Sequence, residues 1–338
     1  MRLLTPAFLL LSALGALAQG GPAAAAVEKD ARAKIRPVLI WVWSKDDPEC
    51  ARMEKERWSI EPLRSLLREF VVWRADVAFF ADPDTWTAVP RWKNLGQGVA
   101  KVNDVRIIHP WGAELYRLES STVTTASSKR IEGVLREVLL AWETRQVPIR
   151  QNVKDLDLLL KARDYDGAAV SAEKLTQHHE GWTIPSLAAG LSKPSLKYRE
   201  TVIPALRKID EEDGVTALLA WVKTSPGVEG SDLAWKELVA AASPRSIEVL
   251  KDRILAHPSV APVRIAALGR IREAGNIDFL VDLLPKFTVP EQPKPGDAQV
   301  AMRDATLTSL RTLTGQNFSS AAEWSDWWAA NRAGFQFP

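Results

Sequence analysis

Hydrophobic positions follow one pattern in the first part of the chain and another in the rest. Two short runs that are almost entirely apolar, 37–43 and 71–77, predict buried β-strands. The stretch between them mixes apolar and polar positions and predicts a helix that ends near Phe70. The chain therefore opens with a strand, a helix and a second strand, an order typical of an α/β domain.

A hairpin and a helix complete this first pattern. Residues 105–108 and 114–118 predict two strands, and Pro110 and Gly112 take the second and fourth positions of the four-residue turn between them. Residues 129–143 then place apolar side chains at helical spacing. The predicted order is strand–helix–strand followed by strand–strand–helix.

From about residue 152 onward the pattern is helical, and strand-like runs are nearly absent. Further helices are expected over 156–162, 168–175, 197–209, 214–223, 232–241, 246–255, 260–274, 277–284 and 299–313. Short helices that cannot bury their apolar faces alone are expected to stack as an α-solenoid.

The first residues have the pattern of an export signal. Arg2 precedes an apolar run from Leu3 to Leu17, and residues 16–18 form a small-x-small cleavage site. We expect residues 1–19 to be a cleaved signal peptide and residues 20–27 to be a flexible leader. The predicted localisation is periplasmic or secreted, by a bacterial-type signal. A retained signal that anchors the chain to a membrane is the alternative.

Composition narrows the function classes. The chain has 338 residues, of which 46% are hydrophobic and 25% charged, with a formal net charge of +2. These values are typical of a globular protein and give no basic excess for binding nucleic acid. Fourteen tryptophans predict an aromatic-rich core, with a ligand-stacking surface as the alternative.

The turn after the first predicted strand carries the most informative residues. Asp47-Pro-Glu-Cys50 stands where thioredoxin-like proteins have Cys-x-x-Cys at the start of their first helix, and the element order over about residues 36–142 also resembles that family. The resemblance implies a thioredoxin-like domain, assigned to 28–147. In it Asp47 replaces the attacking cysteine and Cys50 matches the resolving one. Asn103 matches the family's cis-proline, and we expect a trans peptide bond there.

The replaced residues argue against dithiol chemistry, because disulfide exchange needs two thiols. Asp47 is a favourable N-cap, and its carboxylate and that of Glu49 oppose ionisation of the Cys50 thiol. We therefore expect a vestigial motif, Asp47, Cys50 and Asn103, with no catalytic residue and no cofactor. Cys50, the single cysteine, is predicted to be a buried, inert thiol. The alternative is a monothiol oxidoreductase, or a peroxide- or thiol-handling enzyme, that uses Cys50.

The helical part carries a second resemblance. Pro262-Val-Arg264, Ala266-Ala-Leu268, the Gly275-Asn276 turn and the Leu-rich stretch 280–284 resemble a HEAT repeat. The resemblance implies a HEAT-like repeat domain over residues 150–335. Such repeats commonly bind another polypeptide on a concave face.

The last helix is expected to close this domain. Trp324, Trp327 and Trp328 lie on one helix face, and the segment resembles a terminal element that follows bacterial HEAT-like repeats. A hydrophobic cap is predicted, with carbohydrate or cell-wall binding by these indoles as the alternative. No metal site is expected, since residues 178–180 stand alone and residues 210–213 lack calcium-loop spacing.

These observations predict an α/β thioredoxin-like N-terminal domain followed by an all-α HEAT-like solenoid. The predicted function is that of an exported, non-catalytic interaction or scaffold protein. Its expected partner is a protein or peptide, with no nucleic acid and no membrane contact beyond the signal peptide.

Overall fold

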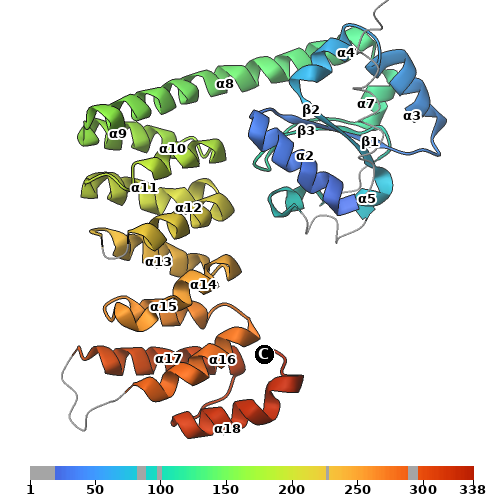
Figure 1. Ribbon diagram of the computed structural model, residues 1–338. Coiled ribbons are helices and arrows are strands. Elements are labelled where there is room, and N and C mark those ends of the chain that lie inside the picture. The colour runs from blue at the N-terminus through green and yellow to red at the C-terminus, as the bar shows by residue number, and fades with distance from the viewer. Residues whose placement is uncertain (1–19, 82–88, 97–100, 226–227, 288–295) are drawn as a thin grey trace, which may run out of the picture. The chain divides into compact units, whose positions relative to one another are not determined.

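The computed structural model describes residues 20–81, 89–96, 101–225, 228–287 and 296–338. The predicted signal peptide lies outside these residues. The chain divides into two compact units, Met1–Arg150 and Gln151–Pro338 (Figure 1). Within the described residues, no helix combines the length and apolar character needed to span a bilayer.

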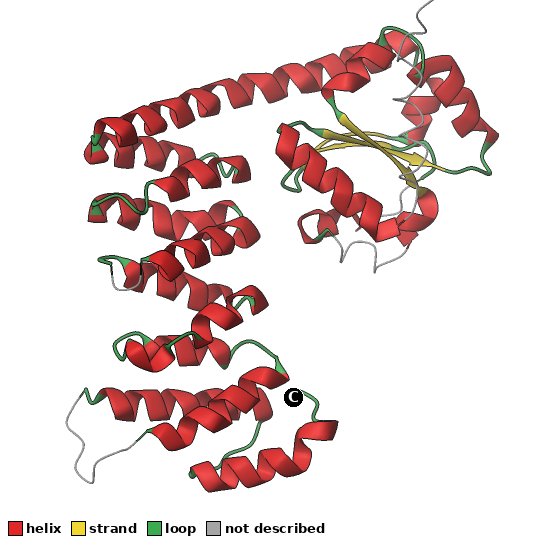
Figure 2. Ribbon diagram, in the orientation of Figure 1, coloured by secondary structure: helices red, strands yellow, loops and turns green. Residues whose placement is uncertain are grey.

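The first unit is built on a mixed four-stranded sheet (Figure 2). Its strands are β1 (Val38–Trp43), β2 (Val71–Asp76), β3 (Val105–Ile108) and β4 (Glu114–Leu118). The order across the sheet is β2-β1-β3-β4, with β1 parallel to β2 and antiparallel to β3. The four predicted strands and the hairpin are therefore confirmed.

Both faces of the sheet are covered, which explains the continuous apolar run of β1. One face packs on α3 (Pro48–Met53), α4 (Leu63–Leu66), α7 (Ser120–Thr125) and the start of α8. The other packs on α2 (Gly20–Lys34), α5 (Val77–Ala81) and the 3-10 helix Pro90–Gly96. Leu39 and Trp41 face the first layer, and Val38 and Ile40 face the second.

Helix α2 differs from the flexible leader expected over residues 20–27. It begins at Gly20, and Ala24, Val27 and Ala31 are buried in the core on one sheet face. These side chains are three to four residues apart, so they lie on one side of the helix. The Gly/Ala/Pro-rich composition suggested flexibility, but the small side chains allow the helix to lie close to the sheet.

The segment between β1 and β2 is also less regular than predicted. A single helix to Phe70 was expected, but α3 passes into a π-helical turn at Glu54–Trp58, and α4 is followed by a 3-10 turn at Leu67–Glu69. Pro62 immediately precedes α4 and has no N–H to donate, so it interrupts the helical hydrogen-bond ladder. A short helix, α7, also lies between β4 and α8.

Helix α8 spans Ser128–Ala162 and contains the boundary between the two units. The sequence predicted a first domain that ends at 147, a second that starts at 150, and separate helices over 129–143 and 156–162. These two helices are one, which continues through Pro148 with Trp142, Ile149 and Leu156 buried on either side of it. Buried side chains on both sides of the proline favour continuation of the helix despite the lost hydrogen bond.

The second unit contains only helices and turns among its described residues. Its helices after α8 are α9 (Tyr165–Thr176), α10 (Ile184–Ala189), α11 (Leu196–Ile209), α12 (Glu211–Thr224), α13 (Ser231–Ala241), α14 (Ile247–Lys251), α15 (Ala261–Leu268), α16 (Ala274–Leu283), α17 (Ala298–Thr314) and α18 (Ala321–Asn331). Short 3-10 turns occur at Gly181–Thr183, Pro244–Ser246, Ile254–Ala256, Leu284–Lys286 and Arg332–Gly334.

Successive helices of this unit form two layers (Figure 1). Helices α9, α11, α13, α15 and α17 pack one on the next, and α10 packs on α12 while α16 packs on α18. Most of the predicted helices are present, but α10 was not predicted. Helix α15 ends at Leu268, six residues before its predicted end, and the predicted Gly275-Asn276 turn lies in the first turn of α16.

Candidate functional site

The candidate site is the turn that joins β1 to α3 in the first unit. Asp47 is the N-cap of α3, and its carboxylate accepts a hydrogen bond of 2.8 Å from the backbone N–H of Glu49. Pro48 occupies the first helical position, where a missing N–H has no cost. Asp47 therefore stabilises the start of α3.

Cys50 is fully buried on the first turn of α3. Its Sγ accepts a hydrogen bond from the backbone N–H of Ser44 at 3.5 Å and donates one to the side-chain oxygen of Asn103 at 3.4 Å. The thiol thus has a donor on one side and an acceptor on the other. Because the Asn103 oxygen can only accept, the contact requires the protonated thiol.

Asn103 lies in the loop before β3, and the structure brings its side chain into contact with Cys50. Its side-chain oxygen also accepts a hydrogen bond of 3.2 Å from the indole N–H of Trp41. Its backbone is left-handed, with φ of 70°, and its N–H donates to the carbonyl of Val42 at 2.8 Å. The preceding peptide bond is trans. Asparagine tolerates this conformation better than most residues do.

The electrostatic surroundings favour the neutral thiol. Burial raises the pKa of Cys50 above its ordinary value, and the carboxylates of Asp47 and Glu49 raise it further. The Ser44 N–H and the Arg74 guanidinium act in the opposite direction but do not outweigh burial. A thiol nucleophile needs the reverse arrangement, which is solvent access and a lowered pKa.

A second cluster at the same end of the sheet was not predicted. The guanidinium of Arg74 lies 4.6 Å from the ring centre of Trp43, and its Nη1 contacts both carboxylate oxygens of Glu54, at 2.8 and 3.0 Å. The alternation of β2 places Arg74 on the α3 side of the sheet, but no sequence spacing links it to Glu54. The cluster fixes Trp43 beside the β1–α3 turn.

The C-terminal tryptophans lie in the second unit, in a cluster with Phe318 and Phe335. Trp324 is fully buried and Trp328 is 5% exposed, while Trp327 is half-buried. The Trp328 indole donates to the carboxylate of Asp278 on α16 at 2.7 Å. Trp324 and Trp328 therefore pack α18 on the preceding helices, and neither presents an open ring face to a sugar.

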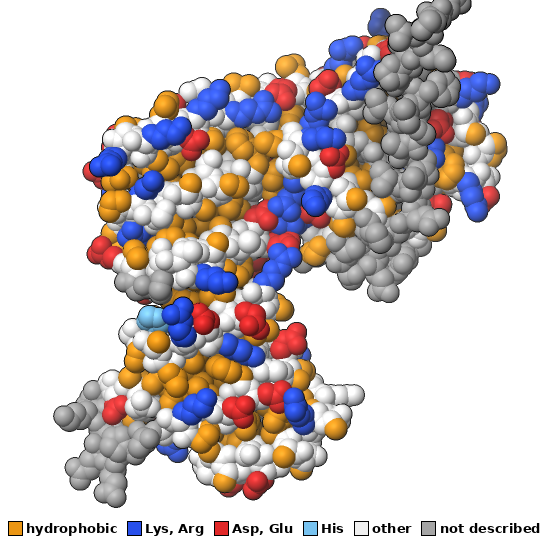
Figure 3. Space-filling model, in the orientation of Figure 1, with side chains coloured by type: hydrophobic (Ala, Val, Ile, Leu, Met, Phe, Trp, Pro, Cys, Tyr) orange, Lys and Arg blue, Asp and Glu red, His pale blue; other side chains and the backbone are white. Residues whose placement is uncertain are grey.

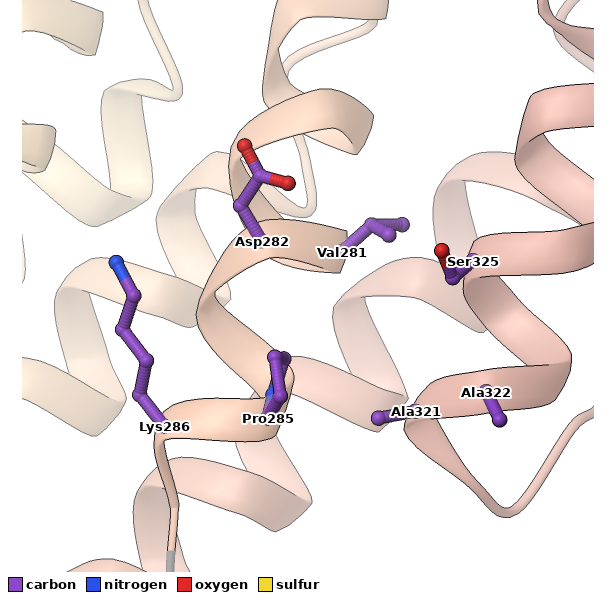
Figure 4. A pocket seen from close by; sticks show the side chains of 7 residues that line it. All are labelled: Val281, Asp282, Pro285, Lys286, Ala321, Ala322 and Ser325. Atoms are coloured by element: carbon purple, nitrogen blue, oxygen red, sulfur yellow. The ribbon is translucent and has the colours of Figure 1, made fainter.

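A groove of about 520 Å³ lies beside this cluster, between α16 with its following turn and α18 (Figure 4). Its walls carry small or apolar side chains, with Asp282 and Lys286 at its edge. It is lined by Val281, Asp282, Pro285, Lys286, Ala321, Ala322 and Ser325. The carboxylate of Asp282 and the ammonium group of Lys286 point away from α18, and Ser325 is the polar side chain on the α18 wall.

Comparison with known proteins adds no assignment. No family model, no curated protein and no solved structure matches the chain. Over the residues that the structure covers, no three His, Cys, Asp or Glu side chains gather into a group that could hold a metal ion. The arrangement of side chains is therefore the basis of the functional proposal.

Proposed function

We propose that the chain is an exported, non-catalytic interaction protein, in which a redox-inactive thioredoxin-like domain precedes a HEAT-like repeat domain. The sheet order β2-β1-β3-β4 and the placement of Cys50 opposite Asn103 support the first assignment. The two layers of successive helices in the second unit support the other. The export proposal depends on the N-terminal sequence pattern alone.

The observation that carries the proposal is the closed environment of Cys50. A thiol that is fully buried, held by Asn103 and flanked by two carboxylates has no path to a disulfide and little thiolate at neutral pH. We infer that this domain binds its partner without exchanging bonds with it.

The second unit supplies an extended surface for a polypeptide partner. Two stacked layers leave a row of helix faces on each side, and such rows suit long protein ligands. Figure 3 shows Lys and Arg interspersed with Asp and Glu on the face drawn, without a continuous patch of one sign. This mixed surface suits a protein or peptide rather than the phosphate backbone of a nucleic acid.

Thiol titration of the native protein tests the non-catalytic assignment. We expect Cys50 to react with a thiol reagent only after denaturation, because its side chain is fully buried. Asp47→Cys in the same chain should form an internal disulfide with Cys50 under mild oxidation, since it restores the pair at the helix start. Rapid labelling of the native wild-type chain near neutral pH would favour the monothiol enzyme instead.

The binding assignment needs a separate measurement. Partners captured from the exported fraction are to be purified and titrated against the wild-type chain and the Cys50→Ala variant under reducing conditions. Equal affinities support binding without bond exchange. A partner that is retained only as a mixed disulfide with Cys50, or a captured ligand that is a cell-wall carbohydrate, would contradict the proposal.

A further inference from the structure

The two faces of the sheet in the first unit are covered by side chains of very different size. The helical segments on the α3 side bury large residues such as Met53, Trp58 and Leu63. On the other side α2 lies across β1 and β2 (Figure 1). Among the described side chains of α2, the buried apolar ones are three alanines and Val27. Apolar burial therefore stabilises the docking of α2 much less than it stabilises the helices on the opposite face.

The sheet surface beneath α2 is made of large apolar side chains. Val38 and Ile40 of β1 and Trp73 of β2 belong to the same core cluster as the buried side chains of α2. The Trp73 ring packs on Phe79 of α5 and on Trp92 of the neighbouring 3-10 helix, with ring centres 4.7 and 6.2 Å apart. These ring contacts do not involve α2, so they hold the sheet surface together independently of this helix.

Polar contacts orient α2 on the sheet. The buried carboxylate of Glu28 contacts the guanidinium of Arg91 at 3.0 Å and that of Arg32 at 3.8 Å. The Arg32 guanidinium also lies 5.6 Å from the ring centre of Trp111 in the hairpin turn. Because desolvation offsets much of the attraction in a buried ion pair, these contacts define where α2 docks but add little to the strength of docking.

The helix has little stability of its own. It is 15 residues long and begins with Gly-Gly-Pro, and a helix of this length is marginal in water even with a favourable sequence. Elements with few buried apolar contacts open at a lower free energy than the core strands. The expected first opening of this unit is therefore the detachment of α2 from an intact sheet.

We propose that α2 is a displaceable strap, and that the sheet surface beneath it binds an amphipathic helix of the partner polypeptide. This inference rests on the proposed function, which supplies a polypeptide partner, and it assigns the surface that the partner uses. A helix with apolar side chains three to four residues apart and a carboxylate at the position of Glu28 complements both the apolar sheet and Arg91. In the closed state α2 occupies this surface and competes with the partner.

Hydrogen exchange of the full chain measures the opening of α2. The amides of Val27 to Ala31 lie in the interior of the helix and should exchange at least tenfold faster than those of β1 and β3, because α2 opens without the sheet. Equal exchange rates in α2 and β1 overturn the proposal, because α2 then opens only when the whole unit unfolds.

A fluorescent peptide of residues 20–34 tests the binding surface in the full chain. Ala31→Asp places a carboxylate on the buried side of α2 and should raise the affinity for this peptide about tenfold or more, since the chain's own helix then leaves the surface free. Ala33→Asp, at an exposed position of the same helix, is the matched control and should bind the peptide as weakly as the wild type. Fluorescence anisotropy measures these affinities.

The state of the strands decides how the Ala31→Asp result is interpreted. Exchange protection of β1 and β3 that is retained without any gain in peptide affinity overturns the proposal. Loss of that protection overturns it as well, because α2 is then part of one cooperative unit with the sheet. Equal affinity of a partner for the wild-type and Ala31→Asp chains would leave the proposed function standing and exclude this surface as its site.

Discussion

A single amide oxygen determines the environment of the only cysteine. The Asn103 oxygen accepts from the Cys50 thiol at 3.4 Å and from the Trp41 indole at 3.2 Å, all within the buried core. A side chain that can only accept through this atom keeps the thiol protonated. The Asn103 side chain therefore stabilises the protonated form of Cys50.

Substitution of Asn103 separates its side-chain and backbone roles. Asn103→Gly removes the acceptor but keeps the left-handed backbone, and it should destabilise the first unit by about 1–3 kcal/mol. Asn103→Ala removes the acceptor and adds left-handed strain, so it should cost about 1 kcal/mol more. Urea unfolding followed by tryptophan fluorescence measures both. Equal stability of all three proteins would show that the hydrogen bonds to Asn103 contribute nothing.

The raised pKa of Cys50 predicts a pH dependence of stability. The folded state keeps the thiol neutral, while the unfolded thiol ionises near pH 8.5. The protonated Cys50 thiol therefore makes its full contribution to the free energy of unfolding below about pH 8.5. This contribution is lost as pH rises through the pKa of the folded thiol. Urea midpoints should fall between about pH 8.5 and 9.5, below the range in which unfolded tyrosine ionises. Cys50→Ala should lack this fall, and an identical slope in both proteins would contradict the prediction.

At the scale of elements, close approach between helices depends on glycine. A Cβ at Gly214 in α12 would overlap the backbone carbonyl of Leu206 in α11. Gly133 in α8 has open space around the same position. Both glycines have the same intrinsic helix propensity, so only the space around each one distinguishes them.

Alanine substitution at these two glycines should have opposite effects. Gly214→Ala forces the α11 and α12 backbones apart and should cost about 1–3 kcal/mol. Gly133→Ala meets no neighbour and should stabilise α8 by about 0.5–1 kcal/mol through reduced backbone entropy in the unfolded chain. Thermal melts of the two variants beside the wild type measure the difference. A loss of stability at both positions would show that helix contacts alone do not explain Gly214.

The sequence predicted elements best where the hydrophobic pattern was strong. The apolar runs of β1 and β2 were enough to predict both strands. Counting residues back from the hairpin turn singled out Asn103, whose side chain contacts Cys50. Helix α2 and the continuation of α8 through Pro148 were missed, because burial against distant residues outweighed their local composition. The Arg74–Glu54 contact was missed for a similar reason, since it joins two elements across the sheet edge.

At the scale of the molecule, two buried arginines make similar contacts in different parts of the second unit. Arg199 and Arg264 are each the fourth residue of their helices, α11 and α15. Arg199 donates to the carbonyls of Leu191 and Lys193 after α10, and Arg264 donates to those of Val249 and Leu250 in α14. Each guanidinium therefore satisfies backbone carbonyls, those of Arg199 just after the preceding helix and those of Arg264 within it. The same kind of contact therefore joins two different pairs of helices in this unit.

Loss of one of these arginines should weaken the stack locally. Arg264→Met leaves the carbonyls of Val249, Leu250 and Asp252 without their donor and should cost about 3 kcal/mol, whereas Arg270→Met, at an exposed position, should change stability by less than about 0.5 kcal/mol.

Hydrogen exchange locates this loss, because the energy of stacked helices is shared mainly between neighbours. Amides of α14 and α15 should lose protection first in Arg264→Met, while those of α9 and α11 keep theirs. The reciprocal variant, Arg199→Met, should expose α10 and α11 and spare α17. Equal loss of protection along the whole second unit in both variants would mean that it unfolds as one block, and this result would contradict the proposed repeat architecture.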